Sequence, residues 1–465
     1  MTNDRKTDAA GRPLSAVLHS VRVPAHSYVM AVFAGTFFSA LAFYLEYTFA
    51  GSVLFLLTWL IVPALALTDR LKFNGKRIYR SGLVPKAWAY LSGSRFWLKA
   101  RDVEQIETHL SPTLRRGGRV YFRYSSEVRA NGVQFSFRSG GSDYREFARA
   151  LFSAVSEEVL DAGSIELRDY LSEPRETRLL AKSSDIPPAD VLESAFRTSS
   201  AKRRKAIAKT DTDPGHSSEK AFGLRQLGNQ LRLSGSLLQA MESFRRAASI
   251  RPDDAWLLFD FARCIQLFAG TEGDVRLERK AAAMLRLAER RAGNDGRLLA
   301  RLGECYFQLG EWGRSRTAFA KSAEAIGDHF RAVRGMAEIA LRDGKLAHVV
   351  HNFSAASRSA ESRAARRWSE AEAEYFSRLS NDDEYLEMEL GRVNLLDTLE
   401  RWRGISFRLC LIGLPVIGLG LYFDDATTAN CGWILSGGSL VLWTLLSLAS
   451  RAFTPRISPE LLGED

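Results

Sequence analysis

The chain has 465 residues, enough for two or three domains, and carries a formal net charge of +10. Its four cysteines, Cys264, Cys305, Cys410 and Cys431, lack the spacing of a disulfide framework or of a CxxC metal site, which favours a reducing compartment. The positive charge is spread along the chain, so it excludes neither nucleic acid nor an anionic membrane surface as a partner.

Two long uncharged runs predict a transmembrane hairpin over 27–67, with Glu46 in its turn. Each run approaches the roughly 20 apolar residues that a helix needs to cross a bilayer. The runs 405–423 and 431–449 predict a second hairpin over 405–449. Buried helices of a soluble core, or a signal peptide cleaved near Ala42, are alternatives for such runs. The 26 residues before the first run and the second run directly after it favour membrane spans.

Basic residues predict the orientation of the four spans. Basic residues precede the first span and follow the second span of each hairpin. The turns between the two spans contain only Glu46, Asp424 and Asp425 as charged residues. We therefore expect the tails 1–26 and 450–465 and the long region between the hairpins to be cytoplasmic, at the inner membrane of a bacterium. Ala31, Gly35 and Ser39 recur at four-residue spacing and indicate close packing within the first hairpin, with dimerisation as the second interpretation.

The region 69–171 predicts a β-rich domain. Val120, Phe122 and Tyr124 alternate with polar residues, as do Val133, Phe135 and Phe137, and an amphipathic helix follows from about Ser142. This order resembles a bacterial pleckstrin-homology-like domain. The resemblance implies a small barrel-like module whose Lys99, Arg101, Arg119 and Arg123 touch lipid headgroups; a solvated strand face is the other interpretation.

The composition of 172–220 predicts a linker with a short helix near Ala189. The basic cluster Lys202, Arg203, Arg204 and Lys205 lies within it. Such a cluster fits either an anionic lipid surface or a solvated helix.

The region 221–402 predicts helical repeats. In 221–254, small and large apolar residues follow a fixed order: Leu224, Leu227, Gly228, Leu231, Gly235, Ala240, Phe244, Ala247 and Pro252. This block resembles a tetratricopeptide repeat, and 296–328 and 330–363 follow the same pattern. The segment 255–295 departs from it, with an apparent insertion at 270–274, and a further helical pair is expected over 364–402.

The resemblance implies a solenoid whose first helices line a groove for a partner peptide. The groove residues that it indicates are Arg225, Asn229, Arg232, Trp256, Arg263, Arg297, Arg301 and Arg334. Four of them, Arg225, Asn229, Arg297 and Arg301, resemble the carboxylate clamp of repeats that grip acidic peptide C-termini, although Asp260 stands where the clamp has Asn. Arginines that only increase solubility are the alternative.

No phosphate loop, HExxH, GxSxG or dinucleotide fingerprint occurs, so we expect neither an enzyme nor a cofactor or metal site. The sequence predicts a multidomain membrane protein with two transmembrane helical hairpins, a β-rich domain and an all-α solenoid. We expect a membrane-anchored scaffold whose repeats bind a protein or acidic peptide partner, or alternatively a sensor of membrane lipid or envelope state. Nucleic acid is not expected as a partner, and a homo-oligomer is compatible with the sequence.

Overall fold

The computed structural model describes residues 18–92, 97–116, 119–130, 132–139, 141–198, 214–454 and 456. The chain divides into two compact units. The first unit gathers Met1–Val23, Leu71–Tyr79 and Arg95–Glu374, and the second gathers Pro24–Arg70, Arg80–Ser94 and Tyr375–Asp465. The first apolar hairpin is therefore an insertion into the β-rich part of the chain.

Two sheets form the β-rich part, with the strand orders β1-β2-β3-β4 and β5-β6-β7. Their bounds are β1 (His19–Arg22), β2 (Arg70–Phe73), β3 (Arg77–Arg80), β4 (Trp97–Lys99), β5 (Gln105–Arg116), β6 (Arg119–Ala130) and β7 (Val133–Arg138). Strands β5, β6 and β7 pair antiparallel, and Phe135 and Phe137 of β7 face the core. The predicted alternation is confirmed. Strand β1 was not predicted. It lies in the segment 1–26, which the sequence analysis assigned to a tail, and it pairs with β2 in the first sheet.

Helix α5 (Ser142–Ala154) covers the sheets with one apolar face. Its residues Tyr144, Phe147, Leu151 and Phe152 are buried in the same core as β7, and the rings of Phe137 and Phe147 lie 4.9 Å apart. The amphipathic helix predicted from Ser142 is thus present, and it packs as the spacing of its apolar residues requires.

The described part of the chain between α5 and the repeats is largely helical. It holds a short 3-10 turn, η3 (Glu157–Val159), and then α6 (Ala162–Tyr170), α7 (Pro174–Ser183) and α8 (Ala189–Thr198). Another 3-10 turn, η2 (Ala100–Asp102), lies earlier, between β4 and β5. Ala181, Ile186 and Leu192 are buried against the first repeat, so the part of the predicted linker up to Thr198 is folded onto it. The basic cluster at 202–205 lies outside the described residues.

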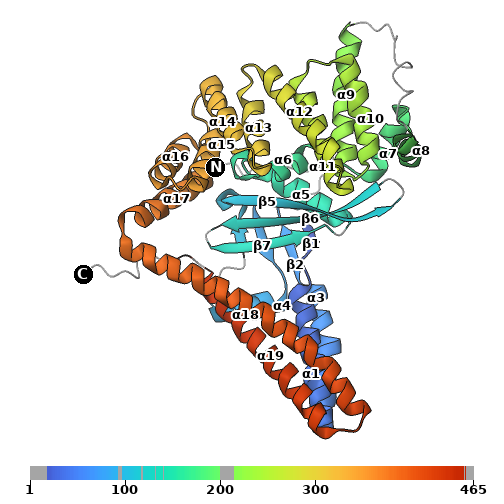
Figure 1. The fold of residues 1–465 in the computed structure, drawn as a ribbon, viewed down its shortest axis with the longest axis vertical. Coiled ribbons are helices and arrows are strands. Elements are labelled where there is room, and N and C mark those ends of the chain that lie inside the picture. Colours follow the sequence, from blue (N-terminus) through green and yellow to red (C-terminus); the bar gives the residue numbers. More distant parts are fainter. Residues whose placement is uncertain are drawn as a thin grey trace, which may run out of the picture. The chain divides into compact units, whose positions relative to one another are not determined.

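Helical hairpins follow one another from Pro214 to Ser359 (Figure 1). They are α9 (Pro214–Leu233) with α10 (Leu237–Ile250), α11 (Ala255–Glu272) with α12 (Val275–Ala292), α13 (Gly296–Gln308) with α14 (Trp312–Ile326), and α15 (Phe330–Arg342) with α16 (Leu346–Ser359). Helix α17 (Arg363–Asn381) follows them. Each helix packs on its partner, and neighbouring hairpins also pack on each other. The predicted helical repeats are confirmed.

Small residues let the two helices of a hairpin approach closely. A Cβ added to Gly228 would lie 2.8 Å from the ring of Phe244, and one added to Gly303 would lie 2.7 Å from that of Phe319. The apparent insertion at 270–274 forms no loop. It extends α11 to Glu272, where Gly273 in a left-handed conformation (φ 66°) ends the helix and Asp274 caps the next one.

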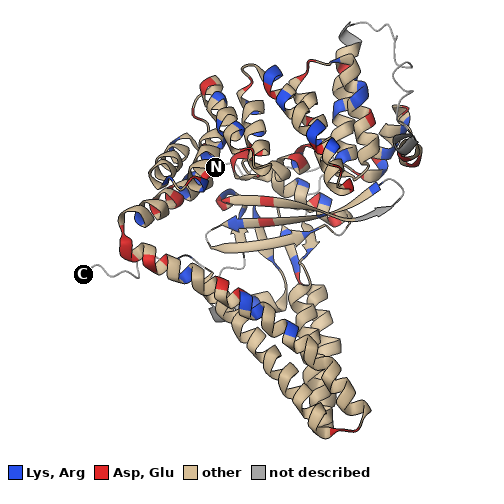
Figure 2. Ribbon diagram, in the orientation of Figure 1, with Lys and Arg blue, Asp and Glu red and all other residues tan. Residues whose placement is uncertain are grey.

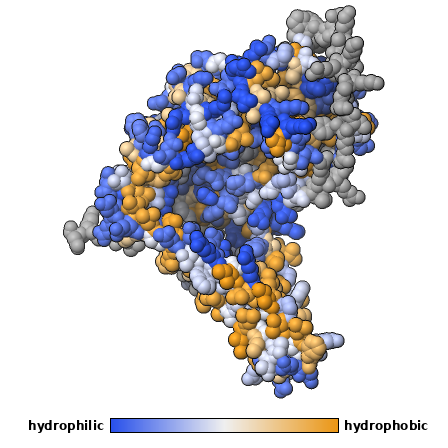
Figure 3. All heavy atoms as spheres, in the orientation of Figure 1, coloured by the Kyte–Doolittle hydropathy of each residue, from blue (hydrophilic) through white to orange (hydrophobic). Residues whose placement is uncertain are grey.

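The second unit contains four helices that are long and apolar enough to cross a membrane, within the part of the chain that is described: His26–Tyr44, Thr48–Thr68, Asp383–Tyr422 and Ala426–Phe453. The first is α1. The second is α2 (Thr48–Leu56), a π-helical turn η1 (Leu57–Ile61) and α3 (Val62–Thr68) in succession, the turn lying just before Pro63. The last two are α18 and α19. Charged residues are almost absent from these helices outside the first part of α18 (Figure 2), and hydrophobic residues make up most of the face of these helices that Figure 3 shows.

Close contacts hold these helices together. Ser39 donates a hydrogen bond to the Gly51 carbonyl (2.8 Å), and a Cβ on Gly35 would lie 2.2 Å from Thr58 Oγ1, so this face packs within the hairpin as the spacing predicts. Ser436 similarly donates to the Cys410 carbonyl (2.9 Å) between α19 and α18. The third predicted span and the helix before it form one continuous helix, α18.

Candidate functional site

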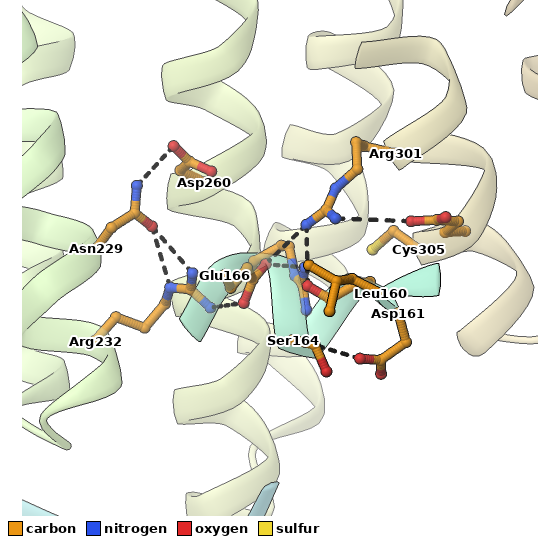
Figure 4. Close-up of polar contacts among 12 residues, drawn as sticks. Leu160, Asp161, Ser164, Glu166, Asn229, Arg232, Asp260, Arg301 and Cys305 are labelled. Carbon is orange, nitrogen blue, oxygen red and sulfur yellow. Dashed lines mark hydrogen bonds and ion pairs between the residues drawn. The ribbon is translucent and has the colours of Figure 1, made fainter. Parts of the chain in front are cut away.

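A buried carboxylate, that of Glu166 on α6, lies among arginines from three repeat hairpins (Figure 4). Arg232 Nη1 on α9 donates to Glu166 Oε2 at 2.9 Å. Arg263 on α11 donates to the other oxygen, and Arg301 Nη2 on α13 lies 3.4 Å from that same oxygen. The first helices of three hairpins therefore converge on a single acidic side chain.

A second layer of polar contacts orients these arginines. Asp260 on α11 accepts hydrogen bonds from Arg225 Nε (2.6 Å) and Asn229 Nδ2 (2.8 Å) on α9. Asn229 Oδ1 in turn accepts from Arg232 Nη2 at 3.0 Å. The guanidinium of Arg225 also lies 5.5 Å from the centre of the Trp256 ring. The amide of Asn229 thus links the Asp260 carboxylate to the Glu166 cluster.

The sheet holds α6 in place. Asp161 caps the helix by accepting from the Ser164 N–H (2.8 Å), and its own N–H donates to the Ile106 carbonyl of β5 (3.0 Å). Ser164 and Thr108 share a hydrogen bond of 2.8 Å, and a Cβ on Gly163 would lie 2.7 Å from the Thr108 carbonyl oxygen. Helix α6 can therefore approach β5 closely only because position 163 is glycine.

The cluster keeps Glu166 ionised. Burial alone would raise the pKa of this carboxyl. The attraction of Arg232, Arg263 and Arg301 is the larger effect, and it lowers the pKa to about 2. Burial lowers the pKa of Arg232, but the negative charges of Glu166 and Asp260 together have the larger effect, so its pKa is raised. Burial raises the pKa of the nearby Cys264 thiol to about 12, so that side chain is not a reactive thiolate.

Beside this cluster lies a cleft of about 690 Å³. Its walls are strand β5, the segment that carries α6, and the first helices of the hairpins. The apolar part of the lining includes Leu110, Leu267, Phe307 and Phe330, and the charged part includes Glu304, Arg331, Arg334 and Glu338. The lining of the cleft therefore combines apolar side chains with charged and neutral polar ones.

Strand β5 brings backbone groups to the cleft. It is an outer strand of its sheet, and Ile106 and Thr108 already bond to Asp161 across that edge. Because the direction of backbone hydrogen bonding alternates along a strand, Leu110 presents its N–H and C=O at the same edge. An extended peptide could therefore pair with β5 at Leu110.

The structure brings together five of the eight residues predicted to line a groove: Arg225, Asn229, Arg232, Arg263 and Arg301. Trp256 lies nearby and donates from Nε1 to Asp295 (2.8 Å). Arg334 pairs with Glu338 (2.9 Å) at the cleft, and Arg297 is exposed on α13.

The four residues that resemble a clamp do not meet on one anion. Arg225 and Asn229 hold Asp260, and Arg301 holds Glu166. The sequence analysis missed Glu166. Its only signal was a carboxylate between the apolar Ile165 and Leu167, near the end of the predicted β-rich domain.

No protein-family model matches this chain, and no curated protein matches it. One solved structure that matches in part is described as the crystal structure of the APC/C hetero-tetramer Cut9-Hcn1. The identity is 13%, the TM-score is 0.30, and the match covers 68% of this chain and 56% of that one. The chain thus spans little more than half of the length of that protein, and a likeness at this TM-score decides nothing about fold or function.

Proposed function

We propose that the protein is a membrane-anchored adaptor whose helical repeats recruit a protein partner. The observation that carries the proposal is the cleft on the first helices of the hairpins, next to the arginine cluster. In this arrangement the four apolar helices cross the bilayer, and the repeats are cytoplasmic, as the basic residues around the spans predict. The two sheets closed by α5 support the assignment of the β-rich part as a pleckstrin-homology-like module.

The cleft favours an extended segment with an acidic side chain. Its β5 edge can pair with a peptide backbone, and Arg331 and Arg334 can meet a carboxylate, as Arg232 already meets Glu166. Glu304 Oε2, in the cleft wall, lies 3.9 Å from Arg301 Nη1 as an ion pair, and neither of these buried atoms makes a hydrogen bond in the described structure. A ligand that donates a hydrogen bond to Glu304 Oε2 would add a contact that this ion pair leaves room for.

Affinity capture with the detergent-solubilised full chain tests this proposal. Gln308→Trp places a large ring in the cleft at an exposed position of α13. Thr317→Trp is the matched control, since it adds the same ring at an exposed position of α14 that does not line the cleft. Proteins recovered with the wild type and with Thr317→Trp should be lost with Gln308→Trp. Recovery of the same proteins by all three chains would refute binding in the cleft.

A further inference from the structure

Helix α4 (Leu83–Ser92) is anchored at the end of the second apolar helix. Asp69, which directly follows α3, accepts two hydrogen bonds from Arg80, from Nε at 2.8 Å and from Nη2 at 2.5 Å. The hydroxyl of Tyr28 on α1 donates to the same carboxylate at 2.8 Å. These contacts fix the start of α4 at the ends of two apolar helices, within the same unit.

The approach of α4 to this anchor is tight. A Cβ on Gly82 would lie 3.0 Å from Asp69 Oδ1, and the Ser81 N–H donates to the Arg70 carbonyl at 2.8 Å. Asp69 itself is 1% exposed. A buried carboxylate held by a bidentate arginine resists displacement, so the position of α4 along the apolar helices is well defined.

The outward face of α4 is apolar and uncovered. Leu83, Val84 and Tyr90 are 64%, 44% and 90% exposed, and Ala87 is also exposed. At 100° per residue these four positions fall on one side of the helix, with Lys86 at its margin. Pro85, on the opposite side, is only partly exposed and lies on the side that packs next to Gly82.

We propose that α4 lies in the plane of the membrane interface, with Leu83, Val84, Ala87 and Tyr90 inserted between the lipid headgroups and the acyl chains. This inference rests on the proposed membrane insertion of the four apolar helices. The lipid surface is the occupant because the exposed face begins where the second apolar helix ends, and the Asp69–Arg80 pair fixes it there. Lys86 and Tyr90 have the long or amphipathic side chains that place a polar group at the headgroup level.

Depth-dependent quenching tests the proposal on the full chain. A Cys431→Ser background removes the exposed thiol, and Cys264, Cys305 and Cys410 are buried. An environment-sensitive fluorophore is attached to Leu83→Cys, to Leu60→Cys in the middle of the second apolar helix, or to Val275→Cys on α12. Leu60 and Val275 are 65% and 55% exposed, which matches them to Leu83. The protein is reconstituted into vesicles of phosphatidylethanolamine and phosphatidylglycerol that carry nitroxide lipids.

We expect a loss of fluorescence at Leu83→Cys that is greater with a nitroxide near the headgroup than with one near the chain end. Leu60→Cys should show the reverse order, and Val275→Cys should show no loss. Quenching at Leu60→Cys but not at Leu83→Cys would overturn the inference while leaving the transmembrane helices intact. Absence of quenching at both sites would overturn the proposed membrane insertion itself. Tyr90→Cys repeats the measurement at the other end of the face, in case labelling at position 83 disturbs the Arg80 contact.

Discussion

The carboxylate of Glu166 is held by arginines from α9, α11 and α13, so one side chain connects the β-rich part to three hairpins. Charges buried in this way are costly to desolvate, and much of their attraction only offsets that cost. Removing one partner is different, because the remaining charges are then left buried and unpaired. Glu166 is therefore the side chain whose loss should matter most in this unit.

Replacing Glu166 with Gln should lower the stability of the first unit by about 3–5 kcal/mol, because the buried Arg232 and the largely buried Arg263 and Arg301 lose their common partner. Denaturant unfolding of the detergent-solubilised chain, followed by hydrogen exchange in α6 and α9, measures the change. Asp253→Asn makes the same chemical change at a carboxylate that is 68% exposed, and it should cost less than about 0.5 kcal/mol. Equal effects of the two substitutions would contradict a special role for the cluster.

The low pKa of Glu166 predicts how stability depends on pH. Because its pKa in the folded chain is about 2, below the ordinary value of 4.5, the stabilisation is complete above pH 4.5 and is lost as the pH falls towards 2. Melting temperatures of the wild type should fall across this window more steeply than those of Glu166→Gln. Parallel pH curves for the two chains would show that folding does not lower the pKa of Glu166.

The basic side of the cluster could be predicted from the sequence, but its acidic centre could not. Arg225, Asn229, Arg232, Arg263 and Arg301 lie at first-helix positions that the resemblance to tetratricopeptide repeats implies for the groove. Glu166 precedes Arg232 by 66 residues in the chain. No local pattern connects the two, because their pairing arises from the tertiary packing of α6 against the repeats.

Repeat hairpins depend on pairs of a small and a large residue, one on each helix. In the third hairpin Gly303 on α13 faces Phe319 on α14, and the hydroxyl of the buried Ser315 donates to the Gly303 carbonyl at 2.8 Å. The sequence pattern shows this pairing because it recurs at fixed spacing. It does not show β1 or α7, which are short and depend on distant segments. β1 pairs with β2, and Val21 of β1 and Ala181 of α7 are buried in the core.

Gly303→Ala should destabilise the repeats by about 1–3 kcal/mol, because the added Cβ would lie 2.7 Å from the Phe319 ring. Gly313→Ala is the matched control on α14, where nothing lies within 4 Å of the added Cβ. There, alanine should stabilise the helix by about 0.5–1 kcal/mol, because glycine loses more backbone entropy on folding. Thermal unfolding measured by circular dichroism distinguishes the opposite signs. Destabilisation by both substitutions would mean that close packing at 303 is not the cause.

Strand pairing restricts how the whole chain can meet a bilayer. Strands β1 and β2 belong to one sheet, yet the first apolar hairpin connects them, so both ends of that hairpin must lie on the same side of a membrane. The second hairpin is similar. Arg392 Nη1 on α18 donates to the carbonyls of Phe453 and Thr454 at the end of α19, at 3.2 and 3.3 Å, which brings the two ends of that hairpin together. With the proposed membrane insertion, each hairpin must therefore cross the bilayer an even number of times.

Which side the repeats occupy is a separate prediction, from the basic residues around the spans. In a Cys431→Ser background, Tyr47→Cys in the turn of the first hairpin should react with a membrane-impermeant maleimide in intact cells, because its side chain is 66% exposed. Val275→Cys on α12, 55% exposed, should react only after permeabilisation. The reverse pattern would place the repeats outside the cytoplasm. The sheet would still require an even number of crossings, so the adaptor would then recruit its partner on the outer side of the membrane.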